Sequence, residues 1–255
     1  DITLDFRSLF GSTDLTSNKD VILYRKYDAP QGVTHCVASY SNVKESRTVG
    51  PNLSLVKSFV CVDGKDWQTS SVENPKDFSI ANLIKTRDSR FEASFYHKPT
   101  VKSKSCYLYP VKFIPRSALK YLEVKGGAPD VEYTSVNNLN GYPVLRYAEV
   151  LLNWIEAKAE LSTLGAGSVT QADIDLSVNK IRNRPLAQEA VERGVQKTAP
   201  MELAALPDDP SRDSDVPALL WEIRRERRME FAFEHSRIID LRRWKKLEYM
   251  DTDAN

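Results

Sequence analysis

The sequence predicts a mostly α-helical protein with loop-rich segments and a few short β-strands, and two observations lead to this fold class. In the C-terminal half, apolar residues recur at the i, i+3, i+4 spacing of helices with a buried face. Residues 1–75 instead hold short alternating runs between Pro and Gly turn signals, a pattern typical of loops with short strands. The 255 residues are 41% hydrophobic, which is ordinary for a globular protein. The net charge of +1 provides no global field that would attract nucleic acid or an anionic membrane.

Residues 1–140 are expected to form a loop-rich part that faces the ligand. The elements expected in it are strands or helical turns at 21–24 and 53–56, a short helix at 76–86, and strands at 91–96 and 106–114. Pro110 cannot donate a hydrogen bond to a neighbouring strand, so it favours a sheet edge for the last of these.

The three cysteines are Cys36, Cys61 and Cys106, and no two of them form a CxxC pair. We expect free, buried thiols, and one disulfide with a leftover thiol is the alternative.

Residues 141–255 are expected to form a helical scaffold within the same domain. The predicted helices span 142–164, 170–192 and 220–244. Thr170 and Asp173 have the spacing of a capping box at the start of the second helix. Pro185 is expected to end or kink that helix early.

The predicted helix at 220–244 carries charges on the face that should be buried. Its apolar stripe consists of Leu220, Ile223, Phe231, Ile238 and Leu241. Arg227, Glu230 and Glu234 fall in the middle of this stripe, although ionised side chains are rarely buried unless they are paired. We therefore expect a network between helices in which Arg146 or Arg182 meets the glutamates.

Glu149, Arg184 and Arg237 are further charges on the same three helices, and we expect them to belong to this network. A di-metal carboxylate site is disfavoured, because none of the three histidines follows a glutamate at the required spacing. A nucleic-acid-binding helix is also disfavoured, because glutamates interleave with the arginines.

Three segments of the helical part resemble the motifs of the SusD/RagB family of Bacteroidetes outer-membrane glycan-binding lipoproteins. They are Tyr142–Leu152 (YPVLRYAEVLL), Asn179–Arg184 (NKIRNR) and Glu226–Trp244 (ERRMEFAFEHSRIIDLRRW). Upstream, Asp88–Phe91 resembles the family's Asp-Pro-Arg segment. His235 stands where many members have glycine. The resemblance covers about residues 50–250.

The resemblance implies a SusD-like helical fold with tetratricopeptide-like helix pairs. It also implies a surface-exposed outer-membrane protein that binds oligosaccharide, delivers it to a TonB-dependent, SusC-like transporter, catalyses nothing and needs no cofactor or metal. By comparison with the family, a helical-repeat half with its lipid-anchored cysteine is expected before Asp1, and a tail after Asn255. Any membrane association would then come from that anchor.

The family motifs are structural, so the glycan-binding residues are chosen on chemical grounds. Sugars present apolar C–H faces and hydroxyl edges, so their sites combine exposed aromatic rings with polar side chains on loops. The candidates are Trp67 first, then Tyr40, with Asn42, Arg47 and Asp66 as hydroxyl partners. The alternative is that these aromatics are ordinary half-buried loop residues. Trp154, Trp221 and Trp244 lie in helical patterns and are expected to be packing residues.

Two other functions stay open at this point. A glycoside hydrolase could use two loop carboxylates among Asp63, Asp66 and Glu73. A transporter lid subunit with little affinity of its own for glycan is the other.

Overall fold

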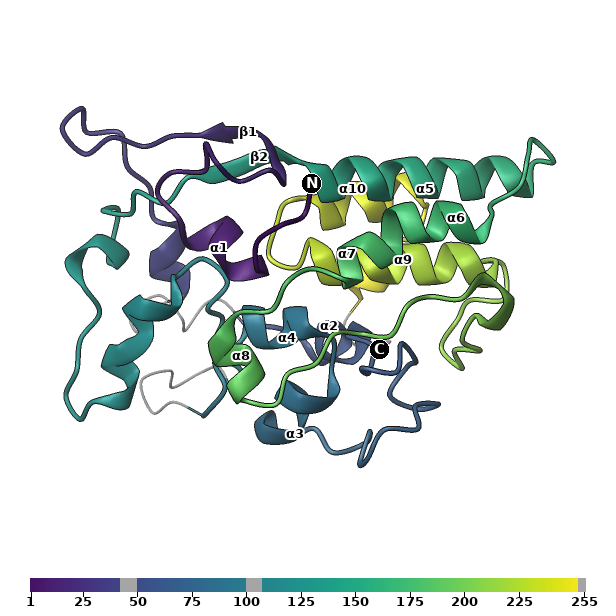
Figure 1. Ribbon diagram of the computed structural model, residues 1–255, viewed down its shortest axis with the longest axis horizontal. Coiled ribbons are helices and arrows are strands. Elements are labelled where there is room, and N and C mark those ends of the chain that lie inside the picture. The colour runs from purple at the N-terminus through teal and green to yellow at the C-terminus, as the bar shows by residue number, and fades with distance from the viewer. Residues whose placement is uncertain (42–49, 100–106, 252–255) are drawn as a thin grey trace.

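The computed structural model describes residues 1–41, 50–99 and 107–251, and it confirms the predicted mostly α-helical fold (Figure 1). The α-helices are α1 (Phe6–Gly11), α2 (Leu53–Ser58), α3 (Ile80–Thr86), α4 (Ser89–Ser94), α5 (Tyr147–Thr163), α6 (Gln171–Ile174), α7 (Lys180–Arg182), α8 (Gln188–Glu192), α9 (Ala218–Glu230) and α10 (Ser236–Arg243). The 3₁₀ segments are η1 (Val37–Ser41), η2 (Arg116–Glu123), η3 (Val131–Tyr133), η5 (Leu203–Ala205) and η6 (Leu247–Met250), and η4 (Asp175–Asn179) is a π-helical turn. The strands β1 (Val21–Arg25) and β2 (Tyr142–Arg146) pair in antiparallel fashion.

The helix predicted from residue 142 begins five residues later than expected. Tyr142–Arg146 is strand β2, in which Tyr142 lies opposite Arg25 and Arg146 opposite Val21. Pro143 has no N–H group, so it suits a short two-stranded sheet better than a helix interior. The helix α5 starts where Asp20 accepts a hydrogen bond from the Tyr147 N–H on its backbone oxygen, at 2.6 Å. As a result, the extended backbone at Arg146 precedes the helix and its side chain is buried.

The strand predicted at 91–96 is also wrong, because most of this segment belongs to helix α4. Asp88 caps this helix, and its carboxylate accepts the Arg90 N–H at 3.0 Å. This local cap and the burial of Phe91 outweigh the β propensity of the aromatic residues. No strand forms in the described part of 106–114, where Pro110 makes only an isolated bridge with Phe95.

The predicted helix at 220–244 is two helices, α9 and α10, joined by a turn in which Phe233 adopts a φ of +65°. A non-glycine residue in this region stops a helix. Ile238 therefore leaves the shared apolar stripe and is 52% exposed, whereas Leu220, Ile223, Phe231 and Leu241 are buried.

The second predicted helix is interrupted as well. The capping box of Thr170 and Asp173 is present at its start, but α7 ends at Arg182, shortly before Pro185, and α8 is separate.

Helix α9 lies at the centre of the molecule between two hydrophobic cores. On one side it packs against α5, and together with α6, η4 and α7 these helices enclose a core that includes Leu152, Ile181 and Ile223. On the other side it contacts α2 and α4, around a core that includes Phe91 and Met229. Figure 1 shows α5 above α6, α7 and α9, with α2, α3 and α4 below them. Because each core receives side chains from α9, the charged residues on α9 lie between them.

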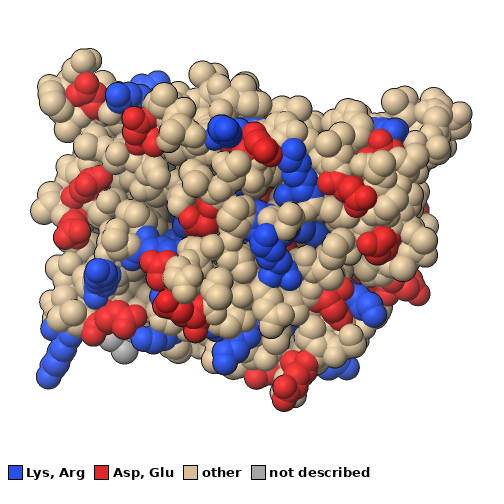
Figure 2. Space-filling model, in the orientation of Figure 1, with Lys and Arg blue, Asp and Glu red and all other residues tan. Residues whose placement is uncertain are grey.

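The two predicted parts of the chain contact each other, since β1 pairs with β2 and α4 packs on α9. The division at residue 140 stays a prediction. On the face seen in Figure 2, acidic and basic side chains are interspersed without a large patch of one sign. None of the helices in the described ranges combines the length and hydropathy needed to cross a bilayer.

Candidate functional site

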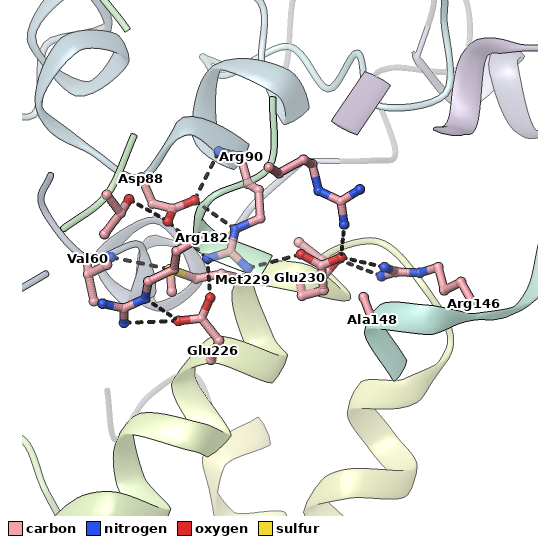
Figure 3. A network of polar contacts seen from close by, with 12 residues as sticks. Val60, Asp88, Arg90, Arg146, Ala148, Arg182, Glu226, Met229 and Glu230 are labelled. Carbon is pink, nitrogen blue, oxygen red and sulfur yellow. Dashed lines mark hydrogen bonds and ion pairs between the residues drawn. The ribbon is translucent and has the colours of Figure 1, made fainter. Parts of the chain in front are cut away.

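Two glutamates of α9 are the centre of a buried ionic network (Figure 3). Glu226 accepts from Arg182 Nε at 3.0 Å and from Arg90 Nη2 at 2.5 Å. Glu230 accepts from Arg90 Nη1 and from Arg184 Nη2, each at 3.0 Å, and it also pairs with Arg146. The predicted pairing of Arg146 and Arg182 with the glutamates is confirmed.

The network also contains a residue that the sequence analysis missed. Arg90 joins Glu226 to Glu230 and is held by Asp88, whose Oδ1 accepts from Arg90 Nε at 2.7 Å. The segment Asp88–Phe91 had been noted only for its resemblance, and nothing in its spacing indicates that it packs on α9.

The surrounding cations keep Glu230 ionised. Burial by itself would raise the pKa of this carboxyl group, but Arg146, Arg184 and Arg90 lower it well below its ordinary value. Since these buried carboxylates and guanidinium groups pair with one another, the network is a structural feature; Arg184 Nε is its one buried nitrogen without a hydrogen-bond partner among the described residues. Glu149 and Arg237, which were expected to join it, make no ion pair within the described residues.

A cleft of about 550 Å³ lies on the other side of α9. Its walls come from five separate places in the chain: α2, the loop after the Asp63-Gly64 turn, the loop around Asp209, a partly buried face of α9, and the region from α10 to η6. Its aromatic lining residues are Trp67, Trp221, Trp244 and Tyr249, and its charged ones are Lys57, Asp66, Asp209, Asp213, Arg224, Arg225, Arg228 and Arg237. The cleft therefore combines aromatic surfaces with many hydrogen-bonding groups.

Of the site residues expected from the sequence, Trp67 and Asp66 line this cleft. The edge of the Trp67 ring meets Phe78, with centroids 5.3 Å apart, and Lys57 Nζ lies 5.5 Å from the indole centroid. Asn42, Arg47 and the side chain of Tyr40 lie outside the described residues.

Asp66 is buried beside Arg225, with Oδ2 and Nη1 3.7 Å apart. Burial raises the pKa of its carboxyl group, and the nearby Asp209 raises it further. The carboxylate of Asp63, by contrast, accepts hydrogen bonds from Ser70 and Ser71 in the loop that follows it.

Trp221 and Trp244 were expected to be packing residues, but both also line the cleft. Trp221 is half-buried and its Nε1 donates to Asp209 Oδ2 at 2.7 Å. Trp154 was expected to be a packing residue too, and this is wrong, because it is 39% exposed on α5. A signal for the cleft was present in the sequence: Trp221, Arg224, Arg225 and Arg228 share one face of α9 at i, i+3, i+4 and i+7.

The described residues contain no group of three or more His, Cys, Asp or Glu side chains that could hold a metal ion. Cys61 is a buried free thiol and Cys36 a half-buried one, while Cys106 lies outside the described ranges.

Comparison with known families identifies the chain. The sequence model of the SusD family matches residues 23–255. The chain belongs to the SusD family. Among solved structures, it is similar to a SusD-like protein from Bacteroides fragilis, with 23% identity and a TM-score of 0.49, over 94% of this chain and 46% of that one. This SusD-family chain thus spans about half the length of that protein, and the comparison with curated proteins found no similar sequence.

Proposed function

We propose that this SusD-family chain binds oligosaccharide in the cleft beside α9, at the bacterial outer-membrane surface. The protein would then deliver the sugar to a TonB-dependent, SusC-like transporter for nutrient uptake, without catalysing a reaction. Family membership supports the general role, and the aromatic cleft supports the position of the site.

The observation that carries the proposal is the composition of the cleft. Its volume of about 550 Å³ lies within the roughly 300–1,000 Å³ typical of small-molecule sites. Trp67, Trp221 and Tyr249 are each partly exposed in it, so they can offer ring faces or edges to the apolar C–H surface of a sugar. Gln68 and Ser211, which are exposed and joined by a 3.1 Å hydrogen bond, can exchange that bond for sugar hydroxyls.

Rigid walls favour binding here, because an ordered site loses little conformational entropy when the ligand enters. Trp221 is held by its hydrogen bond to Asp209, and Trp67 by contact with Phe78. The helices α9 and α2, which carry much of the lining, pack directly on each other.

Isothermal titration calorimetry with a panel of plant and host oligosaccharides tests the proposal. We expect at least one glycan to bind, and Trp67→Ala to weaken that binding about tenfold or more, since an aromatic contact contributes on the order of 0.5–1.5 kcal/mol beyond the apolar area that it buries, and about 1.4 kcal/mol is a factor of ten. Trp154→Ala is the matched control, because Trp154 is an exposed tryptophan outside the cleft.

The other outcomes point to the alternatives. If no sugar binds, the chain is better explained as a transporter lid with little glycan affinity. If the panel is hydrolysed and Asp66→Asn abolishes hydrolysis, a glycoside hydrolase replaces the proposal, with Asp66 and Asp209 as the carboxyl pair beside Arg225. For the partner, cross-linking of the complete protein on intact cells is expected to yield a TonB-dependent barrel, and its absence from the products would contradict the delivery step.

A further inference from the structure

Two arginines of the cleft, Arg228 on α9 and Arg237 on α10, are not paired with any carboxylate of the described residues. Arg228 donates one hydrogen bond, from Nη2 to Ser54 Oγ at 2.9 Å. The guanidinium of Arg237 lies 5.7 Å from the centroid of the Trp244 ring. Both differ from Arg90, Arg146 and the other network arginines, each of which contacts at least one carboxylate.

The carboxylates near these two arginines already have cationic partners. Asp66 and Asp209 both lie against Arg225, which Glu222 also contacts at 2.9 Å. Asp213 pairs with Lys246 at 2.7 Å. Among the described residues, none of these acidic side chains forms an ion pair with Arg228 or Arg237.

Asp240, one turn along α10 from Arg237, also has other cationic partners. Its carboxylate is 2.9 Å from Arg227 and 2.8 Å from Arg243. Asp240 therefore attracts Arg237 electrostatically without forming an ion pair with it, and the Arg237 guanidinium has no direct carboxylate contact among the described residues.

Two positive charges that are partly buried side by side without a paired carboxylate carry an electrostatic cost. Burial, together with the nearby charges of Arg237 and Arg225, lowers the pKa of the Arg228 guanidinium to about 9. Burial also lowers the pKa of Arg237. A bound anion would relieve both the desolvation and the repulsion, since partly buried like charges are stabilised by a counter-charge.

The surroundings of the arginines suit an anion carried by a sugar. Trp244 is buried and contacts the guanidinium groups of Arg224 and Arg237, at 4.9 and 5.7 Å from its ring centroid, so the basic wall is held by packing. A planar guanidinium donates two parallel hydrogen bonds to a carboxylate or sulfate. Trp67 and Trp221 line the same cleft, so one ligand can stack its ring and place its charge on the arginines.

We propose that the cleft is selective for anionic oligosaccharides, bearing uronic acid carboxylates or sulfate esters, whose charged group is bound by Arg228 and Arg237. This inference rests on the proposed function, because it names the class of sugar taken by the same cleft. The shared chemistry is a negatively charged group on a sugar ring, and the two sources are separated by the ligands below.

The test uses calorimetry with matched pairs of sugars on the full chain: an oligogalacturonide against its methyl ester, and a sulfated oligosaccharide against its desulfated form. We expect the acidic member of at least one pair to bind about tenfold or more tightly than the neutral one, as charge-assisted hydrogen bonds imply. Its affinity should fall as the salt concentration rises. Preference in the first pair identifies a uronate and in the second a sulfate.

Variants then locate the anion. Arg228→Gln and Arg237→Gln are each expected to weaken the acidic sugar about tenfold while changing the neutral sugar little. Arg242→Gln is the control, since Arg242 is exposed on α10 outside the cleft, and it should change neither. Thermal melts confirm that each variant is folded.

The results distinguish a failure of the anion inference from a failure of the proposed function. If sugars bind but acidic and neutral members are equal, or if both arginine variants bind the acidic sugar normally, the anion inference is overturned and the proposed function stands. If no sugar of either kind binds, the proposed function fails first. If a glutamate-rich peptide competes as strongly as the acidic sugar, the arginines are a site for a protein segment and the sugar assignment is overturned.

Discussion

Replacing Glu230 with alanine is expected to destabilise the protein by about 3–5 kcal/mol, the usual cost of removing one partner from a buried ionic cluster. Glu230 is 0% exposed and contacts Arg90, Arg146 and Arg184, so the substitution leaves three buried guanidinium groups with fewer partners. The loss stays below that of three separate ion pairs, because each arginine keeps another carboxylate. These remaining contacts are Arg90 with Asp88 and Glu226, Arg146 with Glu234, and Arg184 with Asp20.

The assay is thermal unfolding followed by circular dichroism and calorimetry. At this chain length, 1 kcal/mol corresponds to about 2–4 °C, so Glu230→Ala should lower the Tm by about 6–20 °C. Asp215→Asn is the control, because Asp215 pairs with Lys246 at the surface with 68% of its side chain exposed, and its loss should cost less than about 1 kcal/mol. A loss of that small size for Glu230→Ala would refute the reasoning.

The pH dependence provides a second measurement of the same group. The pKa of Glu230 is lower in the folded protein than its ordinary value of 4.5, so the unfolded chain takes up the proton first as the pH falls. The contribution of Glu230 is therefore fully present above about pH 4.5 and is lost as the pH falls below it. Glu230→Gln should unfold with a shallower pH dependence in that acid range, and an unchanged slope would contradict this assignment.

Two further predictions concern neighbouring charges. Burial raises the pKa of Glu222 from 4.5 to about 7, and its Oε2 has no hydrogen-bond partner among the described residues. The stability linked to this proton is therefore present below about pH 4.5 and lost as the pH rises to about 7, by on the order of 3 kcal/mol. The free energy of unfolding of Glu222→Gln should thus rise relative to that of the unchanged protein between pH 5 and 8 in denaturant titrations, and equal dependence of the two free energies on pH would exclude a raised pKa. Arg90→Ala should cost about 3–5 kcal/mol in thermal unfolding, because it leaves Asp88 without its main cation. A loss near zero would show that the bridge between α4 and α9 contributes little.

The buried network illustrates what a helical pattern can predict. Arg227, Glu230 and Glu234 fall on an apolar stripe, and the cost of burying unpaired charge was enough to predict cationic partners at Arg146 and Arg182. The same pattern could not indicate Arg90, because its partners lie about 140 residues away and α4 has no charge periodicity. Arg237 was misassigned for a related reason, since the turn at Phe233 rotates α10 relative to α9.

The cleft could be predicted only in part. Trp67 stood out because a polar loop has nothing periodic to bury an indole, and it does line the cleft. Trp221 and Trp244 could not be recognised, because a helical tryptophan looks the same in sequence whether its neighbours cover it or leave a space beside it.

The sequence by itself determined the mostly helical fold class and the need for an ionic network, because local periodicity and the cost of burying charge are properties of the chain alone. Its motifs also indicated the SusD family, by their resemblance to those of known members. Only the tertiary structure decided where helices break, which residue joins Glu226 to Glu230, and that α2, α9, α10 and two loops leave a cleft between them. These features depend on segments far apart in sequence meeting in space. Their packing, rather than any local pattern, leaves Arg228 and Arg237 without carboxylate partners in the described cleft.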